Sequence, residues 1–283
     1  MRPLVIIIGG GPAGVACAIW LRKLGVPATL LEAGPRLGGL QTRSPYENLW
    51  IPGVQGRTGQ QVAQGLADHA EALGVDAWLT CRAIAVVRDV SGDYTVTTAT
   101  TALVAPYIVI ATGTMPRAGG FKSGQVVAIG PGTPMEAMDV KGRRVAILGG
   151  GDNAFDQARF VVERGGTTTI FTRTAPRAQK LLQAMVPQVR VVVGPYVARQ
   201  DGLTVNGEAF DAFGVMYGFE AVVPYGLEPE RERGFVAVDR QGETSLERVY
   251  ACGEVTDYWH PCVATAVAHG VQVAKQISLR VAG

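Results

Sequence analysis

The stretch LVIIIGGGPAG, residues 4–14, decides the fold of this 283-residue chain. A short β-branched run ends in a glycine cluster, and the helix-forming run VACAIWL follows. This order predicts a buried strand, a tight turn and the N-terminus of a helix. Gly9 permits the turn, Gly11 lets a pyrophosphate approach the backbone, and Gly14 lets the helix pack on the strand. The helix N-terminus offers free N–H groups and partial positive charge to phosphates. We therefore expect a dinucleotide-binding unit.

Glu32 completes this unit. It follows the second predicted strand, ATLL at residues 28–31, and its carboxylate can accept a hydrogen bond from a ribose hydroxyl. A glycine-rich turn in another kind of α/β unit is the alternative. That alternative explains the glycines alone, whereas strand, glycines, helix, second strand and terminal acid occur here together.

Composition narrows the class of protein. The length fits one large or two medium domains, and the formal net charge of +2 is too small to indicate a nucleic-acid or membrane partner. The apolar run 5–8 is far too short to span a bilayer, and we interpret it as a core strand and not a signal peptide. Cys17, Cys81, Cys252 and Cys262 form no Cys-x-x-Cys pair, which indicates neither a disulfide framework nor a metal site. A reducing cytoplasm is the expected location.

The opening pattern occurs a second time. RVAIL at 144–148 is a predicted strand, GGGDNA at 149–154 a second glycine turn, 155–164 a helix and 167–171 a second strand. Two dinucleotide units therefore lie about 140 positions apart. This repeat predicts two bound dinucleotides, one of them a flavin. A degenerate structural repeat is the alternative.

The second unit differs where its second strand ends. No acid stands there; Thr172 and Arg173 follow the strand, and Arg177 comes one helical turn later. Arginine suits the 2′-phosphate of NADPH, whereas a carboxylate suits a free ribose hydroxyl. The pattern favours NADPH over NADH, with solvated surface arginines as the alternative.

Helical spacing also predicts helices over 60–73 and 263–281. Alternating segments at 86–98 and 102–109 are typical of a small meander of strands.

Four features now stand in order along the chain: 9–14, Ala111-Thr112-Gly113, 149–154 and Ala251-Cys252-Gly253-Glu254. Together they resemble the two-dinucleotide-domain flavoprotein superfamily. Within it the chain is similar to the thioredoxin reductase-like group, including the ferredoxin/flavodoxin–NADP reductases of that type. The loop YENLWIPG at 46–53 resembles that group's loop beneath the flavin, and GETS at 242–245 resembles its approach to the last flavin motif.

The resemblance implies an α/β fold with two Rossmann-like domains of the three-layer ββα type. It implies an FAD-binding domain at 1–115 and 225–283, into which an NAD(P)-binding domain at 116–224 is inserted. It also implies hydride transfer from NADPH or NADH to FAD, and from there to a small redox protein, a quinone or another small acceptor. A cytoplasmic homodimer is expected, without a nucleic-acid or membrane partner.

Carried onto this sequence, the motifs of the group imply two sets of cofactor-binding residues. The expected FAD-binding residues are Gly9, Gly11, Pro12, Ala13, Gly14, Glu32, Gly39, Leu40, Asn48, Ala111, Thr112, Gly113, Gly253, Glu254 and Val263. The expected NAD(P)-binding residues are Gly149, Gly151, Asp152, Asn153, Ala154, Arg173 and Arg177.

The chain departs from the group at three places. Thioredoxin reductases carry a Cys-x-x-Cys pair just before the second glycine motif, but residues 127–134 hold no cysteine, so we do not expect thioredoxin reduction by disulfide exchange. Phe171 and Thr172 replace a histidine and an arginine of the phosphate-binding pattern. Glu254 replaces the aspartate that binds the ribityl chain; it keeps the charge and is one methylene longer.

The flavin performs the redox chemistry in this class of protein, so we expect the catalytic side chains beside it. The resemblance places the N-terminus of the last helix at the pyrimidine end of the flavin, with His260 and Cys262 within reach as catalytic candidates. The helix N-terminus would favour a Cys262 thiolate. In the alternative interpretation Cys262 is a small apolar residue packed under the helix.

Two other functions stay open from the sequence. The flavoenzyme could take its electrons from a source other than NAD(P)H, as a ferredoxin-linked enzyme or as an oxidase of a small substrate or thiol. The chain could also be a non-enzymatic flavin-binding sensor or scaffold.

Overall fold

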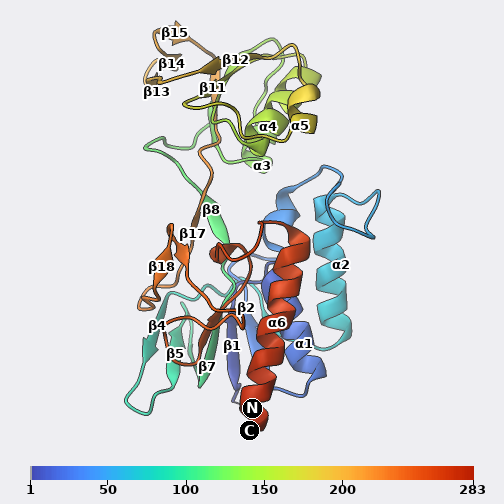
Figure 1. Ribbon diagram of the computed structural model, residues 1–283, viewed down its shortest axis with the longest axis vertical. Coiled ribbons are helices and arrows are strands. Elements are labelled where there is room, and N and C mark those ends of the chain that lie inside the picture. The colour runs from blue at the N-terminus through green and yellow to red at the C-terminus, as the bar shows by residue number, and fades with distance from the viewer. Residues whose placement is uncertain (1) are drawn as a thin grey trace. The chain divides into compact units, whose positions relative to one another are not determined.

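The computed structural model describes residues 2–283, which form two compact units (Figure 1). Unit 1 runs up to Met115 and resumes at Glu220, and unit 2 is the inserted segment Pro116–Phe219. The chain leaves unit 1 in β8 (Thr114–Pro116) and returns in β17 (Phe219–Ala221). Each unit has its own parallel sheet and its own apolar core.

Unit 1 is built on a five-stranded parallel sheet with the strand order β20-β7-β1-β2-β3. Its strands are β1 (Val5–Ile8), β2 (Ala28–Leu31), β3 (Asp76–Trp78), β7 (Tyr107–Ile110) and β20 (Val249–Ala251). The apolar run predicted as a core strand is β1, at the centre of the sheet, with all four residues buried. Because the strands run parallel, the loops that follow β1, β7 and β20 meet at one edge.

Alternating side chains of β1 enter two different cores. Val5 and Ile7 pack against the helical side, where α1 (Pro12–Lys23), α2 (Gly59–Ala72) and α6 (Val263–Ala282) lie side by side in Figure 1. Ile6 and Ile8 pack on the opposite side with Val86 and other residues of a meander. The meander consists of β4 (Ala85–Arg88), β5 (Tyr94–Thr97) and β6 (Ala102–Ala105). Helices, sheet and meander form the three layers expected from the sequence.

Short elements complete unit 1. They are η1 (Gly39–Arg43), β18 (Arg231–Glu232), β19 (Phe235–Val236) and η2 (Gly253–Val255). No helix within residues 2–283 combines the length and the hydropathy needed to cross a membrane.

Unit 2 repeats the same plan, with a parallel sheet in the order β12-β11-β10-β16-β9. Its strands are β9 (Val127–Ile129), β10 (Arg144–Leu148), β11 (Thr167–Thr172), β12 (Arg190–Val193) and β16 (Ala212–Val215). Its helices are α3 (Thr133–Glu136), α4 (Asp152–Glu163) and α5 (Lys180–Ala184). A meander of β13 (Ala198–Arg199), β14 (Thr204–Val205) and β15 (Glu208–Ala209) completes the unit.

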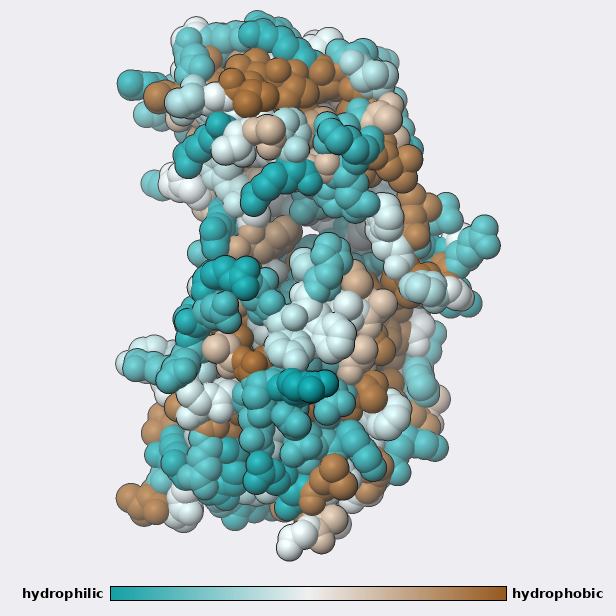
Figure 2. Space-filling model, viewed as in Figure 1, coloured by the Kyte–Doolittle hydropathy of each residue, from teal (hydrophilic) through white to brown (hydrophobic). Residues whose placement is uncertain are grey.

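The core of unit 2 that faces its meander is rich in aromatic residues. Phe171 and Phe213 from the sheet pack with Val205 and Phe210, and the rings of Phe171 and Phe210 meet edge to face at 5.7 Å. Figure 2 also shows a hydrophobic patch on the surface of unit 2 in the region of β12, where Val193 is exposed. The sequence-based fold class, two Rossmann-like units of the ββα type, is confirmed.

The chain re-enters unit 1 at Glu220, before residue 225, where the second segment of this domain is expected to begin. Two hydrogen bonds account for this position. The Val222 N–H donates to the Gly113 carbonyl oxygen at 3.1 Å, and the Thr112 hydroxyl donates to the Val222 carbonyl oxygen. Ala221 and Val223 also pack against the core between the sheet and the meander of unit 1.

Candidate functional site

The glycine turn after β1 is tightly packed at Gly9 and Gly14 and open at Gly11. Gly9 has φ +111°, and a Cβ atom there would lie 2.4 Å from the Ala111 carbonyl oxygen. A Cβ atom at Gly14 would lie 1.9 Å from the Gly9 carbonyl oxygen, so only glycine lets α1 approach the strand this closely. At Gly11 the nearest atom to such a Cβ is the Gly39 Cα at 3.9 Å. The direction in which a Gly11 side chain would project is therefore free for a ligand.

Glu32 lies beside this turn at the end of β2. Its carboxylate accepts the Gly10 N–H at 2.7 Å and the Gly34 N–H at 2.6 Å. These charge-assisted bonds fix the carboxylate at the turn. A carboxylate held here can also accept a hydrogen bond from a ribose hydroxyl.

One cleft of about 380 Å³ in unit 1 gathers these features. Its size lies within the range of roughly 300–1,000 Å³ that ligand sites occupy. The cleft is lined by Gly9, Gly11, Pro12, Ala13, Glu32, Gly34, Pro35, Arg36, Gly39, Leu40, Gln41, Thr42, Arg43, Ala111, Thr112, Gly113, Thr114, Cys252, Gly253, Glu254, Val263 and Ala266. Segments far apart in the sequence thus meet at the carboxyl edge of the sheet.

All the expected FAD-binding residues line this cleft except Gly14 and Asn48. Gly14 lies in the first turn of α1, where its missing side chain allows close packing. The Asn48 side-chain amide donates to Gln41 Oε1 at 3.2 Å, and Gln41 is a lining residue. Asn48 therefore contacts a residue that lines the cleft and does not line the cleft itself.

Sequence reasoning missed several residues of the cleft, above all Arg36, Gln41 and Arg43. Gln41 and Arg43 belong to the 3-10 helix η1, and Arg36 lies in the loop before it. The segment carries no periodic pattern, so its only signal was its place after Glu32 and beside the glycine pair at 38–39. Two arginines on the wall of the cleft supply positive charge for a pyrophosphate.

Glu254 occupies the far end of the cleft, in the turn after β20. Its Oε2 lies 3.5 Å from the Thr114 hydroxyl. Burial raises the pKa of the Glu254 carboxyl, and the contact with Thr114 partly opposes that shift. The longer side chain that replaces the expected aspartate is therefore accommodated at the cleft, close to the start of α6.

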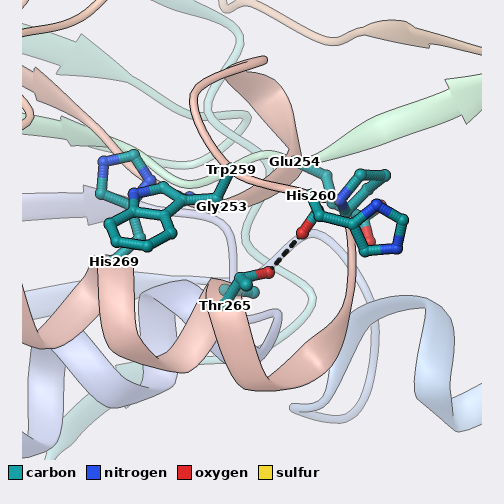
Figure 3. Close-up of a pocket in the computed structure, with 8 residues that line it drawn as sticks. Gly253, Glu254, Trp259, His260, Thr265 and His269 are labelled. Carbon is teal, nitrogen blue, oxygen red and sulfur yellow. Dashed lines mark hydrogen bonds between the residues drawn. The ribbon is translucent and has the colours of Figure 1, made fainter. Parts of the chain in front are cut away.

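A second, small cavity of about 10 Å³ lies next to Glu254, between η2 and the start of α6 (Figure 3). Figure 3 shows His269 and Trp259 on one side of it and Glu254 and His260 on the other. His260 is exposed, and its carbonyl oxygen accepts the Thr265 hydroxyl at 2.6 Å. The first catalytic candidate thus lines the small cavity and not the large cleft.

Cys262, the second catalytic candidate, is the N-cap of α6. Its N–H donates to the Thr265 hydroxyl oxygen at 3.3 Å, and its Sγ lies 3.3 Å from the same oxygen. The side chain is half-buried. The N-cap is a structural role that serine and threonine commonly fill, and Cys262 takes it here.

Two of the other cysteines are separated from solvent, and Cys81 is half-buried. Cys17 and Cys252 are fully buried in the core between the sheet and the helices. Burial raises the pKa of the Cys252 thiol to about 12 and raises that of Cys17 well above its ordinary value. All four cysteines are free thiols. Within residues 2–283, no three His, Cys, Asp or Glu side chains are grouped to hold a metal ion.

The glycine turn of unit 2 has the same geometry as that of unit 1. Gly149 has φ +138°, and a Cβ atom there would lie 2.2 Å from the Met216 carbonyl oxygen. At Gly151 a Cβ atom would meet nothing within 4 Å. Asp152, Asn153 and Ala154 follow in the first turn of α4. The structure thus brings five of the expected NAD(P)-binding residues together in one turn.

Thr172 takes the place that Glu32 has in unit 1. Gly149 N–H bonds to the carbonyl oxygen of Phe171, as Gly9 N–H bonds to that of Leu31, so the residues after both carbonyls correspond. The Thr172 hydroxyl donates to the Thr174 carbonyl oxygen at 2.9 Å. Unit 2 therefore presents no carboxylate at this position.

The expected phosphate-binding arginines are both exposed and lie on the loop that follows β11. The Arg177 N–H donates to the Gly150 carbonyl oxygen at 2.8 Å, which ties this loop to the glycine turn. The Arg173 guanidinium lies 6.0 Å from the ring centroids of both Tyr196 and Tyr217. Both cations remain available to an anion.

Fold and site together define a protein with two Rossmann-like units, each presenting an open glycine turn at a helix N-terminus. The chain belongs to the pyridine nucleotide-disulphide oxidoreductase family, which it matches over residues 3–270.

Named relatives span several activities. The ferredoxin–NADP reductase of Limosilactobacillus fermentum is 31% identical, with 90% of this chain and 86% of that protein covered. A glucosaminate ammonia-lyase of Pseudomonas fluorescens is 26% identical over 95% of this chain and 93% of that protein. The crystal structure of Lactococcus lactis thioredoxin reductase superposes with a TM-score of 0.84 and 22% identity, covering 99% of this chain and 98% of that one. This last likeness shows the fold.

The chain is therefore an FAD-dependent oxidoreductase of pyridine nucleotides, and the resemblance drawn from its sequence is confirmed. The residues of the large cleft fit FAD on their own terms. The space beside Gly11 is open, the Glu32 carboxylate lines the same cleft, and Arg36 and Arg43 bring positive charge to it, as a site for a pyrophosphate and a ribose would require.

Proposed function

We propose that this protein carries electrons from NADPH, through FAD bound in the large cleft of unit 1, to a small redox protein of the ferredoxin type. The observation that carries the proposal is the cleft itself, which Gly11, Glu32 and Glu254 all line. The 31% identity to a ferredoxin–NADP reductase over 90% of the chain supports the choice of acceptor.

The residues of unit 1 bind and orient the flavin. The N–H groups at the start of α1 and the arginines of the cleft wall meet the pyrophosphate, and Glu32 accepts a ribose hydroxyl. Glu254 meets the ribityl chain. FAD held by these residues would supply the redox chemistry, taking a hydride from the nicotinamide nucleotide and passing electrons to the acceptor. His260 and Cys262, at the start of α6, stay predicted catalytic groups beside the flavin ring.

Unit 2 binds the nicotinamide nucleotide at the turn Gly149–Gly151. The open space at Gly151 admits the pyrophosphate, and Asp152, Asn153 and Ala154 form the first turn of the helix beneath it. Arg173 and Arg177 supply the charge that favours a 2′-phosphate. Thr172, where unit 1 has an acid, does not repel that phosphate. These features support NADPH as the preferred nucleotide.

The sequence supports a protein acceptor that is reduced without disulfide exchange. It holds no Cys-x-x-Cys pair, and two of its four cysteines are fully buried. Disulfide exchange needs an accessible thiolate and a second thiol close to it. Direct electron transfer to an iron–sulfur protein needs neither.

An anaerobic assay of purified, FAD-loaded protein tests this function. NADPH is supplied, and reduction of a [2Fe–2S] ferredoxin is followed by absorbance beside reduction of thioredoxin in a parallel reaction. We expect ferredoxin to be reduced and thioredoxin to stay oxidised. Thioredoxin reduction without ferredoxin reduction would contradict the proposal.

We also propose that the protein is a cytoplasmic homodimer. Free thiols suit a reducing compartment. Light scattering on the purified protein should give twice the 29.8 kDa mass of the chain. Fractionation of cells that express it should place it with the cytoplasmic markers.

A further inference from the structure

His269 stands outside the cleft and has no part in the proposed electron path. It lies in α6, only 3% exposed, and its Nδ1 lies 3.3 Å from the Gly253 N–H. An N–H can only donate, so Nδ1 must present its lone pair, and the imidazole is neutral with its proton on Nε2. Burial favours the same state, because it lowers the pKa of His269 to about 4.

The end of strand β20 explains why Gly253 needs this partner. The Cys252 N–H still bonds across the sheet to the Ile110 carbonyl oxygen at 3.0 Å. The next N–H, that of Gly253, has left the strand ladder. A backbone donor at such a place must find another acceptor. His269, which comes from a different element, supplies it.

Gly253 is also held by its carbonyl group and by its close packing. Its carbonyl oxygen accepts the Thr256 N–H at 3.1 Å and the Thr256 hydroxyl at 2.9 Å. It has φ +79°, and a Cβ atom there would lie 2.7 Å from the Ala13 Cβ in α1. The hydrogen bond that Gly253 donates to His269 therefore adds to a set of contacts that restrain this turn.

The helix that carries His269 is itself fixed in place. At Gly270, the next residue, a Cβ atom would lie 2.1 Å from the Ala13 carbonyl oxygen. The rings of Tyr258 and His269 lie 5.8 Å apart, and Trp259 lines the adjoining small cavity (Figure 3). An acceptor on such a rigid, enclosed support is preorganised for the Gly253 N–H.

We propose that His269 is a positioning residue for the flavin: by accepting the Gly253 N–H it holds the Gly253–Glu254 turn in the conformation that binds FAD. Gly253 and Glu254 both line the large cleft. The inference rests on the placement of FAD in that cleft. His269 itself does not line the cleft. In this inference it nevertheless contributes to the affinity and the geometry of the cofactor site.

The test compares His269→Leu with His269→Asn. Asparagine keeps an acceptor on Cγ, where histidine has Nδ1, whereas leucine leaves the Gly253 N–H without a partner. In the leucine variant the free turn can move to pair the Gly253 N–H with water, and giving up that partner on FAD binding corresponds to roughly a tenfold loss in affinity. We expect the Kd for FAD to rise about tenfold in His269→Leu and to stay near the wild-type value in His269→Asn. The visible absorption bands of bound FAD should shift in the leucine variant alone.

Two further variants separate the possible outcomes. His69→Leu makes the same change at an exposed histidine of α2 and should leave the Kd unchanged. If His269→Leu does not fold, His269→Gln takes its place, because glutamine carries its acceptor one methylene too far. If His269→Asn and His269→Gln then bind FAD equally well, the inference is overturned. It is also overturned if His269→Leu binds FAD with the wild-type Kd.

Gly11→Val distinguishes failure of this inference from failure of the proposed function. If Gly11→Val retains full FAD, the cleft is wrongly assigned. If Gly11→Val loses FAD while His269→Leu keeps wild-type affinity and spectrum, the cleft assignment stands and the role of His269 is refuted.

Discussion

At the scale of single residues, the glycines of the two turns serve different physical purposes. Gly9 and Gly149 have positive φ, and a Cβ atom on either would collide with a backbone carbonyl oxygen, at 2.4 Å and 2.2 Å. These positions need glycine for the fold. At Gly11 and Gly151, such a Cβ atom would have no neighbour within 3.5 Å. The proposed function explains glycine at these two positions by the space that a pyrophosphate needs, so they are suitable for functional substitutions.

Arg173 and Arg177 should determine the choice of nucleotide. Alanine at either position removes a charge-assisted bond to the 2′-phosphate, so we expect the KM for NADPH to rise roughly tenfold and that for NADH to change little. Steady-state kinetics with both nucleotides measures this. Arg199→Ala, at an exposed arginine of β13, is the matched control. Equal losses with NADPH and NADH would show that the arginines have another role.

Cys262 carries two competing interpretations, catalytic thiol and structural N-cap, and serine variants decide between them. If Cys262 only caps α6, the cysteines are dispensable for turnover. Cys252→Ser places a hydroxyl in the core and should lower stability, whereas Cys262→Ser keeps a capping side chain at the start of α6. Both variants should retain most NADPH-dependent reduction of ferricyanide or a quinone. A variant that keeps its FAD and loses turnover would bring a thiol into the mechanism.

At the scale of elements, the contact between α1 and α6 supports the cofactor site. The side of α6 at Gly270 faces Ala13 and Cys17 of α1, and α1 begins beneath the glycine turn. A Cβ atom at Gly270 would lie 2.1 Å from the Ala13 carbonyl oxygen, an atom that a rigid helix cannot move aside. The two helices are therefore held at a separation that only glycine allows.

Gly270→Ala should therefore destabilise the protein, by about 1–3 kcal/mol as for other overpacked sites. The same substitution at Gly65 in α2 provides a control of opposite sign. A Cβ atom there meets only the Arg57 side chain at 3.8 Å, so Gly65→Ala should stabilise the helix by about 0.5–1 kcal/mol. Urea denaturation followed by circular dichroism measures both. Equal effects of the two substitutions would contradict the close packing of α1 and α6.

The same helix should make stability depend on pH. His269 has a pKa of about 4 in the folded protein and an ordinary value of 6.5 in the unfolded chain, so the unfolded chain binds the proton more readily. The stabilisation is therefore complete above pH 6.5 and is lost as pH falls towards 4, by about 3 kcal/mol at pH 4.

The comparison of wild type with His269→Asn isolates this effect. Glu254 and His260 line the same small cavity as the imidazole, the Tyr258 ring lies beside it, and all three remain in the variant. Burial raises the pKa of Glu254, which favours the fold at low pH and has the opposite sign. Between pH 7 and 4 the free energy of unfolding should fall less in His269→Asn than in wild type, as measured by denaturation. Identical pH profiles would rule out His269 as the source.

The elements differ in how well the sequence predicts them, and the reason is the range of the interactions that form them. The strand–turn–helix units at β1–α1 and β10–α4 follow from local patterns of β-branched residues and glycines. The helix expected over 263–281 is α6, Val263–Ala282, because its apolar residues recur at helical spacing. The 3-10 helix η1 has no such pattern, so Gln41 and Arg43 were missed. The bond between His269 and Gly253 joins two elements and has no local signal.

At the scale of the whole molecule, one template is used twice, with a change of residue that bears on function. The strand–turn–helix–strand segments and the meanders of the two units correspond in order, whereas the edge strand comes last in unit 1, as β20, and first in unit 2, as β9. Where unit 1 has Glu32, which accepts two backbone N–H groups, unit 2 has Thr172, which bonds within its own loop. This difference supports a division of work in which unit 1 binds FAD and unit 2 binds NADPH.

An anaerobic absorbance titration of wild type and Gly151→Val with NADPH tests this division most directly. Valine at Gly151 fills the space open to a pyrophosphate in unit 2 and leaves the cleft of unit 1 untouched. We expect Gly151→Val to purify with full FAD, and we expect its flavin absorbance to bleach only at far higher NADPH than in wild type. Bound FAD that stays oxidised in the wild-type protein with both NADPH and NADH would contradict this division.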